Sequence, residues 1–95
     1  DQAEGMIKKA LEFEPNNGAY IDSLGWLYFK QGKIKEGLEK LENASSLLED
    51  PVIYDHLGDA YLKTGEAQKA KGAWEKSIKL DVAQESVKKK IDAIH

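Results

Sequence analysis

The residues best suited to chemistry in this chain are a histidine and the two carboxylates beside it. His56 lies in the segment Asp55-His56-x-x-Asp59, and imidazole and carboxylate groups are common ligands of zinc. The second histidine, His95, is far along the chain, and cysteine is absent, so no further ligand stands at metal spacing. We therefore predict a solvent-facing helix surface around His56 and no metal site.

Other forms of catalysis also lack their residues. No serine or threonine stands beside a plausible base, and neither a phosphate-binding glycine loop nor a dinucleotide glycine motif occurs. Paired acids such as Glu12 and Glu14 are two residues apart, so on a helix they face different ways. We predict that the chain is not an enzyme and binds no cofactor.

The charge of the chain argues against nucleic acid as a partner. The net charge is −3, and all 14 basic residues are lysine, interleaved with 17 acidic residues. Without arginine, the chain lacks the planar group that reads guanine edges and grips phosphates at two points. No stretch approaches the roughly 18 apolar residues that cross a bilayer, so we also predict no membrane insertion.

Turn-forming residues divide the chain into helices. Gly32 and Gly65 follow two apolar segments and are suited to the left-handed conformation that ends a helix. Asp50-Pro51 reads as an N-cap followed by the first helical residue, and Asp81-x-x-Gln84 resembles a capping box. We predict helices at about residues 2–14, 18–31, 34–48, 51–64, 66–80 and 83–95.

One spaced pattern occurs twice. Ile21-x-x-Leu24-Gly25-x-x-Tyr28 returns 33 residues later as Tyr54-x-x-Leu57-Gly58-x-x-Tyr61. A period of about 33–34 residues is typical of stacked helical hairpins. The glycines predict close contacts between the two helices of each hairpin, opposite small residues of the second helix. These small residues are Gly37, Ala44, Ala70 and Ser77.

The pattern resembles that of the tetratricopeptide-repeat family, W-x₂-L-G-x₂-Y, then A-x₃-F, then P. The second helices continue it as Gly37-x₃-Leu41 and Ala70-x₃-Trp74, and the opening helix carries only the back half, Ala3-x₃-Ile7. The resemblance implies an all-α, right-handed superhelical solenoid of helix-turn-helix units, with about six antiparallel helices. It also implies a scaffold that binds proteins or peptides.

The pattern divides a single domain, residues 1–95, into repeat units. These are a half repeat at 1–15, full repeats at 18–50 and 51–82, and a capping helix at 83–95, whose Lys88-Lys89-Lys90 run is expected to face water. The residues around the two Leu-Gly pairs also resemble the last repeats of longer bacterial proteins of this family. We therefore expect a soluble protein of the bacterial cytoplasm or periplasm. Upstream repeats would then cover Ile7, Ala10 and Phe13, and self-association through this uncapped N-terminal helix is a further hypothesis.

Gly37 departs from the family pattern, which has alanine there. Glycine in mid-helix weakens a helix by about 1 kcal/mol relative to alanine, so Gly37→Ala is expected to raise the melting temperature.

One stripe of side chains on the second helix is not expected to pack against the other helix of its hairpin. Asp22, Trp26 and Phe29 recur at i, i+4 and i+7, and the resemblance implies that this stripe lines a concave groove for partner peptides. Packing of Trp26 and Phe29 against the opening helix or an upstream repeat is the alternative. The predicted groove consists of Ala19, Asp22, Trp26, Phe29, Lys30, Val52, Asp55, Asp59, Leu62 and Lys63.

The acids of this groove bear on the ligand. Some members of the family hold a C-terminal carboxylate with lysine and asparagine, whereas the matching positions here carry Asp22, Trp26, Asp55 and Asp59. Three carboxylates would repel such a ligand, so we expect no carboxylate clamp and a preference for an apolar or aromatic segment with one or two basic residues. The alternative function is a structural spacer or oligomerisation element of a larger protein.

Overall fold

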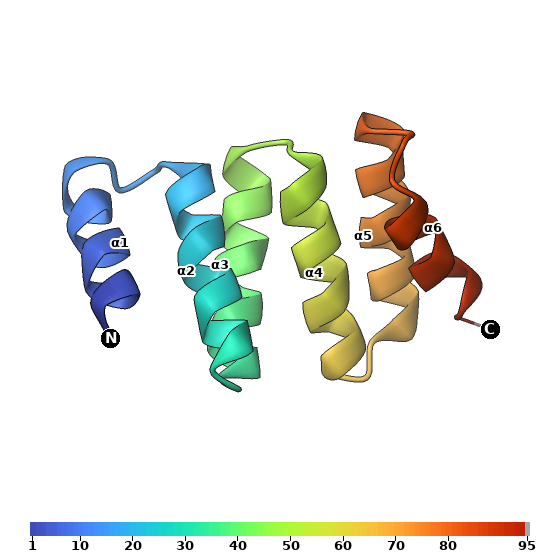
Figure 1. The fold of residues 1–95 in the computed structure, drawn as a ribbon, viewed down its shortest axis with the longest axis horizontal. Helices are drawn as coiled ribbons and strands as arrows, with labels where there is room; N and C mark the ends of the chain where they lie inside the picture. Colours follow the sequence, from blue (N-terminus) through green and yellow to red (C-terminus); the bar gives the residue numbers. More distant parts are fainter. Residues whose placement is uncertain (95) are drawn as a thin grey trace.

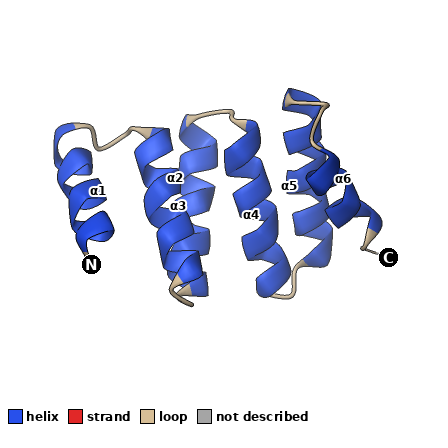
Figure 2. Ribbon diagram, viewed as in Figure 1, coloured by secondary structure: helices blue, strands red, loops and turns tan. Residues whose placement is uncertain are grey.

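Six α-helices stand side by side in chain order in the computed structural model, which describes residues 1–94 (Figure 1). No strand occurs among these residues, so the all-α prediction is confirmed (Figure 2). The body measures 40 × 25 × 19 Å. The helices are α1 (Gln2–Phe13), α2 (Gly18–Lys30), α3 (Ile34–Leu47), α4 (Pro51–Lys63), α5 (Ala67–Leu80) and α6 (Glu85–Asp92).

The turns follow the sequence signals. Gly32 and Gly65 have positive φ angles of 84° and 83°, a conformation that favours glycine. At the start of α4, the backbone N–H of Val52 donates to Asp50 Oδ1 at 2.8 Å, and Pro51 occupies the first turn, where its missing N–H costs nothing.

The last helix differs from its prediction. It covers Glu85–Asp92 and not 83–95, and the part of that range at His95 lies outside the described residues. The capping box is also wrong, because the Gln84 side chain points back to α5. Its Nε2 donates to the backbone oxygen of Ser77 at 3.0 Å and to Ser77 Oγ at 2.8 Å. Gln84 therefore ties α6 to the last turn of α5.

Each hairpin is closed by a contact that only small residues allow. A Cβ on Gly37 would lie 2.8 Å from the backbone oxygen of Gly25 and 3.0 Å from the backbone nitrogen of Phe29. In the second hairpin, a Cβ on Gly58 would overlap the indole ring of Trp74, so the nearest neighbour of Gly58 is a large ring and not one of the small residues predicted there. The indole N–H of Trp74 donates to the backbone oxygen of Asp55 at 3.2 Å, which fixes the ring over the glycine.

The core consists of three buried clusters in series along the array. Each joins residues of adjacent helices, so every hairpin is covered by its neighbours. The clusters are Ile21, Ala44 and Ile53; Leu41, Tyr54, Leu57, Ala60 and Ala73; and Ala70, Trp74 and Val87.

The apolar residues of α1 differ in how deeply they are buried. Leu11 packs against the cluster of Ile21, and Ile7 and Ala10 are half-buried, so the expectation that Ile7 and Ala10 need an upstream cover is wrong. The exposed apolar side chains of α1 are Met6, at 73% of its surface, and Phe13, at 80%.

Two glycines in helix interiors give a test of these contacts. The expectation that Gly37→Ala stabilises is wrong, because the added methyl group meets backbone atoms of α2 that cannot move aside. We expect a loss of about 1–3 kcal/mol. Gly72 of α5 has no neighbour within 4 Å of an added Cβ, so Gly72→Ala should gain roughly 0.5–1 kcal/mol from helix propensity. Urea unfolding of both variants measures this, and shifts in the same direction would contradict it.

Candidate partner-binding groove

Residues of four helices form one continuous face, called here the α2–α4 face. Trp26 and Phe29 come from α2 and Asp59 and Leu62 from α4, while Ile7 of α1 flanks the face at one side. Lys90 of α6 reaches it from the other side. The stripe that the hairpin leaves unused on α2 thus does meet the corresponding stripe on α4.

An aromatic stack occupies the middle of this face. The ring of Trp26 lies parallel to that of Phe29, with centroids 4.9 Å apart, and parallel to the imidazole of His56, with centroids 3.9 Å apart. The ammonium group of Lys30 lies 5.5 Å from the Trp26 ring. Trp26 is therefore held in one orientation from both sides.

His56 also makes the polar link between the two hairpins. Its Nδ1 lies 2.9 Å from Oδ1 of Asp22, which is 9% exposed. Because a carboxylate only accepts hydrogen bonds, the imidazole donates here. The prediction that His56 belongs to a plain solvent-facing surface is therefore wrong. Asp22 and His56 are 34 residues apart, one more than the 33-residue period of the repeat. Residues separated by about one period lie on adjacent repeats, and this spacing could have predicted the contact.

The remaining two acids of the face pair with the last helix. Nζ of Lys90 lies 2.8 Å from Asp55 Oδ1 and 3.0 Å from Asp59 Oδ1. The prediction that the whole lysine run faces water is therefore wrong for Lys90, although Lys89 is exposed. The run wraps around a helix, so its three side chains point in different directions.

Burial and charge act against each other at this ion pair. Burial raises the pKa of Asp59, and the hydrogen bond and charge of Lys90 only partly oppose it. Burial lowers the pKa of Lys90, but the hydrogen bonds and charges of Asp55 and Asp59 outweigh it, so the pKa of Lys90 is raised. The two carboxylates thus depend on one ammonium group.

The acids of the face are therefore engaged with basic side chains. Asp22 binds His56, and Asp55 and Asp59 bind Lys90, so the premise of three unpaired carboxylates was wrong. The expected preference for basic residues in the ligand does not follow from this arrangement. No group of three or more metal-ligating side chains occurs within residues 1–94.

Two hollows of about 430 Å³ each flank the aromatic stack. One lies between Phe29 and Leu62 and includes Asp59 and Lys63. The other lies beside Trp26 and is lined by Ile7, Asp22, Ser23, Trp26, Leu27, Lys30 and His56. Of the predicted groove residues, Ala19, Val52 and Asp55 line neither hollow. The hollows add four residues to the set: Ile7, Ser23, Leu27 and His56.

The two aromatic residues differ in their supports. Phe29 packs against the buried cluster that contains Leu41, so the alternative of a packing role holds in part for Phe29. This contact is with the core cluster that α3, α4 and α5 share. Trp26 is half-buried, with His56 and Phe29 as its stacking partners.

Comparisons with known proteins agree with the repeat pattern. No family model matches the chain. It is 34% identical over 70 residues to the beta-barrel assembly-enhancing protease of Escherichia coli (strain K12), a match that covers 74% of this chain and 14% of that protein. It is 33% identical over 58 residues to the TPR repeat-containing protein PA4667 of Pseudomonas aeruginosa, covering 61% of this chain and 10% of that protein.

The crystal structure of a thermophilic TPR protein of Thermus thermophilus superposes with a TM-score of 0.85. The match covers 97% of this chain and 47% of that one, with 21% sequence identity. The chain has the tetratricopeptide-repeat fold. The resemblance drawn from the residue pattern is confirmed.

The tetratricopeptide-repeat chain spans only a small part of its bacterial relatives, at most 14% of the two proteins above. Within residues 1–94, none of its helices combines the length and the apolar character that a bilayer-crossing helix requires.

Replacing Lys90 tests the ion pair of the face. Lys90→Met leaves Asp55 and Asp59 half-buried without their ammonium partner, so we expect a loss of about 1 kcal/mol at about pH 7. The pKa of Asp59 is raised in the folded state, so its ionised form costs stability once the pH exceeds the ordinary pKa of an aspartate. The ammonium group of Lys90 offsets part of that cost. The loss should shrink as the pH falls towards about 3, because the raised pKa of Asp59 lets its carboxyl group bind a proton first.

Thermal unfolding across this pH range measures the effect, with Lys89→Met as the exposed control. An equal loss for Lys90→Met at both ends of the range would contradict the pairing.

Proposed function

We propose that the chain is a protein-interaction module whose α2–α4 face binds an apolar or aromatic segment of a partner protein. The observation that supports this most directly is Trp26, held in a stack between Phe29 and His56, with one hollow beside Trp26 and another beside Phe29. A fixed aromatic ring beside hollows can receive side chains with little loss of conformational freedom. A partner segment would lie across the ring and place one side chain in each hollow.

The proposal includes the absence of a carboxylate clamp. The positions that would carry lysine and asparagine in such a clamp carry Asp22, Trp26, Asp55 and Asp59. The three acids among them pair with His56 and Lys90, so neither of these two basic side chains is left to bind a terminal carboxylate. Binding energy would come from apolar contact, with hydrogen bonds at the edges of the face.

We also propose that the chain does no chemistry of its own. The acids of the face pair with His56 and Lys90, and the hydroxyl of Ser23, which lines the same hollow as His56, donates to the backbone oxygen of Ala19 at 3.1 Å. Ser23 therefore lacks the hydrogen bond to a base that activates a nucleophile. One relative is a protease in which the match covers 14% of the length. A small share of this kind fits a binding module within a larger protein.

Trp26→Ala tests the face directly. Peptides selected from a random phage-displayed library on the wild-type chain should be rich in apolar and aromatic residues and should lose about tenfold or more in affinity for Trp26→Ala. Fluorescence anisotropy measures the affinity. Phe13→Ala is the matched control, since Phe13 is an aromatic residue with 80% exposure on α1, outside the face.

Phe29 needs a milder substitution than alanine. It supports the core cluster near Leu41, so Phe29→Leu keeps most of the packing while removing the stack. Circular dichroism should show unchanged helix content in all three variants. Peptides that bind Trp26→Ala as tightly as the wild type would refute the proposed face.

Self-association is the second candidate, and the exposed Met6 and Phe13 side chains on α1 favour it. Two copies pairing through α1 would cover both side chains, consistent with an oligomerisation element. Sedimentation velocity should then show a mass that rises with concentration for the wild type and stays monomeric for Phe13→Glu. A monomeric mass for the wild type at all concentrations would refute this candidate.

A further inference from the structure

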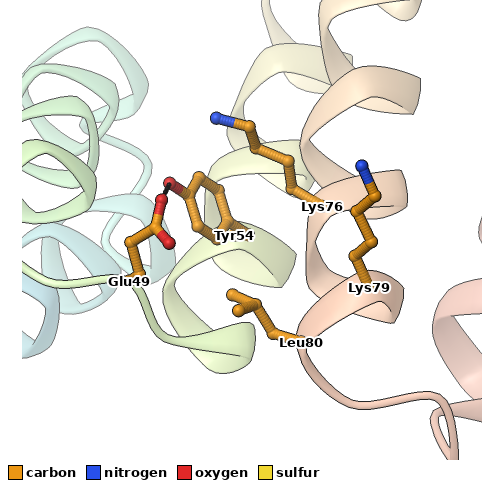
Figure 3. Close-up of a pocket in the computed structure, with 5 residues that line it drawn as sticks. All are labelled: Glu49, Tyr54, Lys76, Lys79 and Leu80. Carbon is orange, nitrogen blue, oxygen red and sulfur yellow. Dashed lines mark hydrogen bonds between the residues drawn. The ribbon is translucent and has the colours of Figure 1, made fainter.

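A second groove lies on a different side of α4 from the α2–α4 face. Its floor is a stripe of α4 formed by Tyr54, Leu57 and Tyr61, and its walls are α3 and α5. The main hollow has a volume of about 580 Å³, and a smaller one of about 140 Å³ adjoins it at Tyr54 and Lys76 (Figure 3). We call this the α3–α5 groove.

The same arrangement of three residues occurs twice across the groove. At one level, the hydroxyl of Tyr61 donates to Glu42 of α3 at 2.7 Å, and Nζ of Lys69 of α5 lies 5.7 Å from the tyrosine ring. Two helical turns away, the hydroxyl of Tyr54 donates to Glu49 at 3.5 Å, and Nζ of Lys76 lies 5.2 Å from that ring (Figure 3). The groove therefore has an acidic wall, an aromatic floor and a basic wall.

The acidic and basic walls differ in what they can still bind. Both glutamates accept hydrogen bonds from the floor tyrosines. On α5, Lys76 and Lys79 have no carboxylate within 4.0 Å in the described part of the chain, and their ammonium groups extend outward on the same side (Figure 3). Within residues 1–94, Lys69 pairs with Glu66 alone, at 3.2 Å, and this glutamate precedes it at the N-cap of α5. The glutamates keep their charges, because a tyrosine hydroxyl is neutral, so the positive charge that is available to a ligand lies on the α5 wall alone.

Gly72 leaves room between the two basic levels. It lies between Lys69 and Lys76 on α5, and an added Cβ would have no neighbour within 4 Å. An interior glycine costs a helix stability, and here no close packing within the chain accounts for it. This open surface at Gly72 lies beside Leu57 and Ala73, which line the same groove, so an apolar side chain of a partner could approach the helix there.

We propose that the α3–α5 groove binds an acidic amphipathic helix of a partner protein, independently of the α2–α4 face. Lys69, Gly72 and Lys76 are spaced i, i+3 and i+7, so the two lysines are about 10 Å apart along α5. A helix lying along α5 matches this spacing with Glu-x-x-Leu-x-x-x-Glu or its reverse. The leucine packs on the open surface at Gly72 and each glutamate meets a lysine.

Two labelled helical peptides test the proposal: one with the Glu-x-x-Leu-x-x-x-Glu pattern and a twin with lysine in place of both glutamates. Fluorescence anisotropy should show binding of the acidic peptide and at least about tenfold weaker binding of the twin. Gly72→Leu should cover the open surface there without harming α5, because leucine is a good helix former, and should weaken the acidic peptide about tenfold or more.

Two charge variants and one face variant complete the design. Lys76→Glu should weaken the acidic peptide, whereas Lys89→Glu, the same change at an exposed position of α6, should not. Trp26→Ala should bind the acidic peptide as the wild type does, which separates this groove from the α2–α4 face. Equal binding of both peptides, no effect of Gly72→Leu, or a loss confined to Trp26→Ala would each overturn the proposal.

Discussion

The contact between Gly25 and Gly37 sets the geometry on which the other features depend. Because a methyl group on Gly37 would meet the Gly25 carbonyl at 2.8 Å, α2 and α3 approach as closely as two backbones can. The second hairpin reaches its contact with a different pair, Gly58 against the Trp74 ring. Both contacts fix the rotation of the first helix of the hairpin about its axis, and the rotation decides which stripe faces which neighbour.

With the rotation of α4 fixed, each stripe of residues along it faces a different neighbour. Trp74 of α5 covers one side, and Tyr54 and Tyr61 face the α3–α5 groove. The stripe with Asp59 faces α6 and the α2–α4 face. A helix of 13 residues can serve so many neighbours because a repeat array places other helices on nearly all its sides.

The spacing of residues in the sequence predicted the features that lie within one helix or turn. It did not predict the contacts between side chains of different repeats. The helices, the turn glycines and the stripe of Trp26 and Phe29 follow from spacing alone. The partners of the acids do not, since Lys90 reaches Asp55 from 35 residues away and outside the repeat pattern. Gly37 was misjudged for a related reason, because helix propensity is a property of one helix and the contact belongs to two.

The two sides of α4 therefore differ in how a ligand could gain binding energy. On the α2–α4 face, a charged ligand would have to break pairs such as Asp59–Lys90 to use their charges, and a half-buried carboxylate left without its partner is costly. Apolar contact with Trp26 carries no such cost. On the α3–α5 side, Lys76 has no carboxylate to give up, so a partner's carboxylate adds an ion pair without removing one. The proposed selection by shape on one side and by charge on the other rests on the same placement of α4.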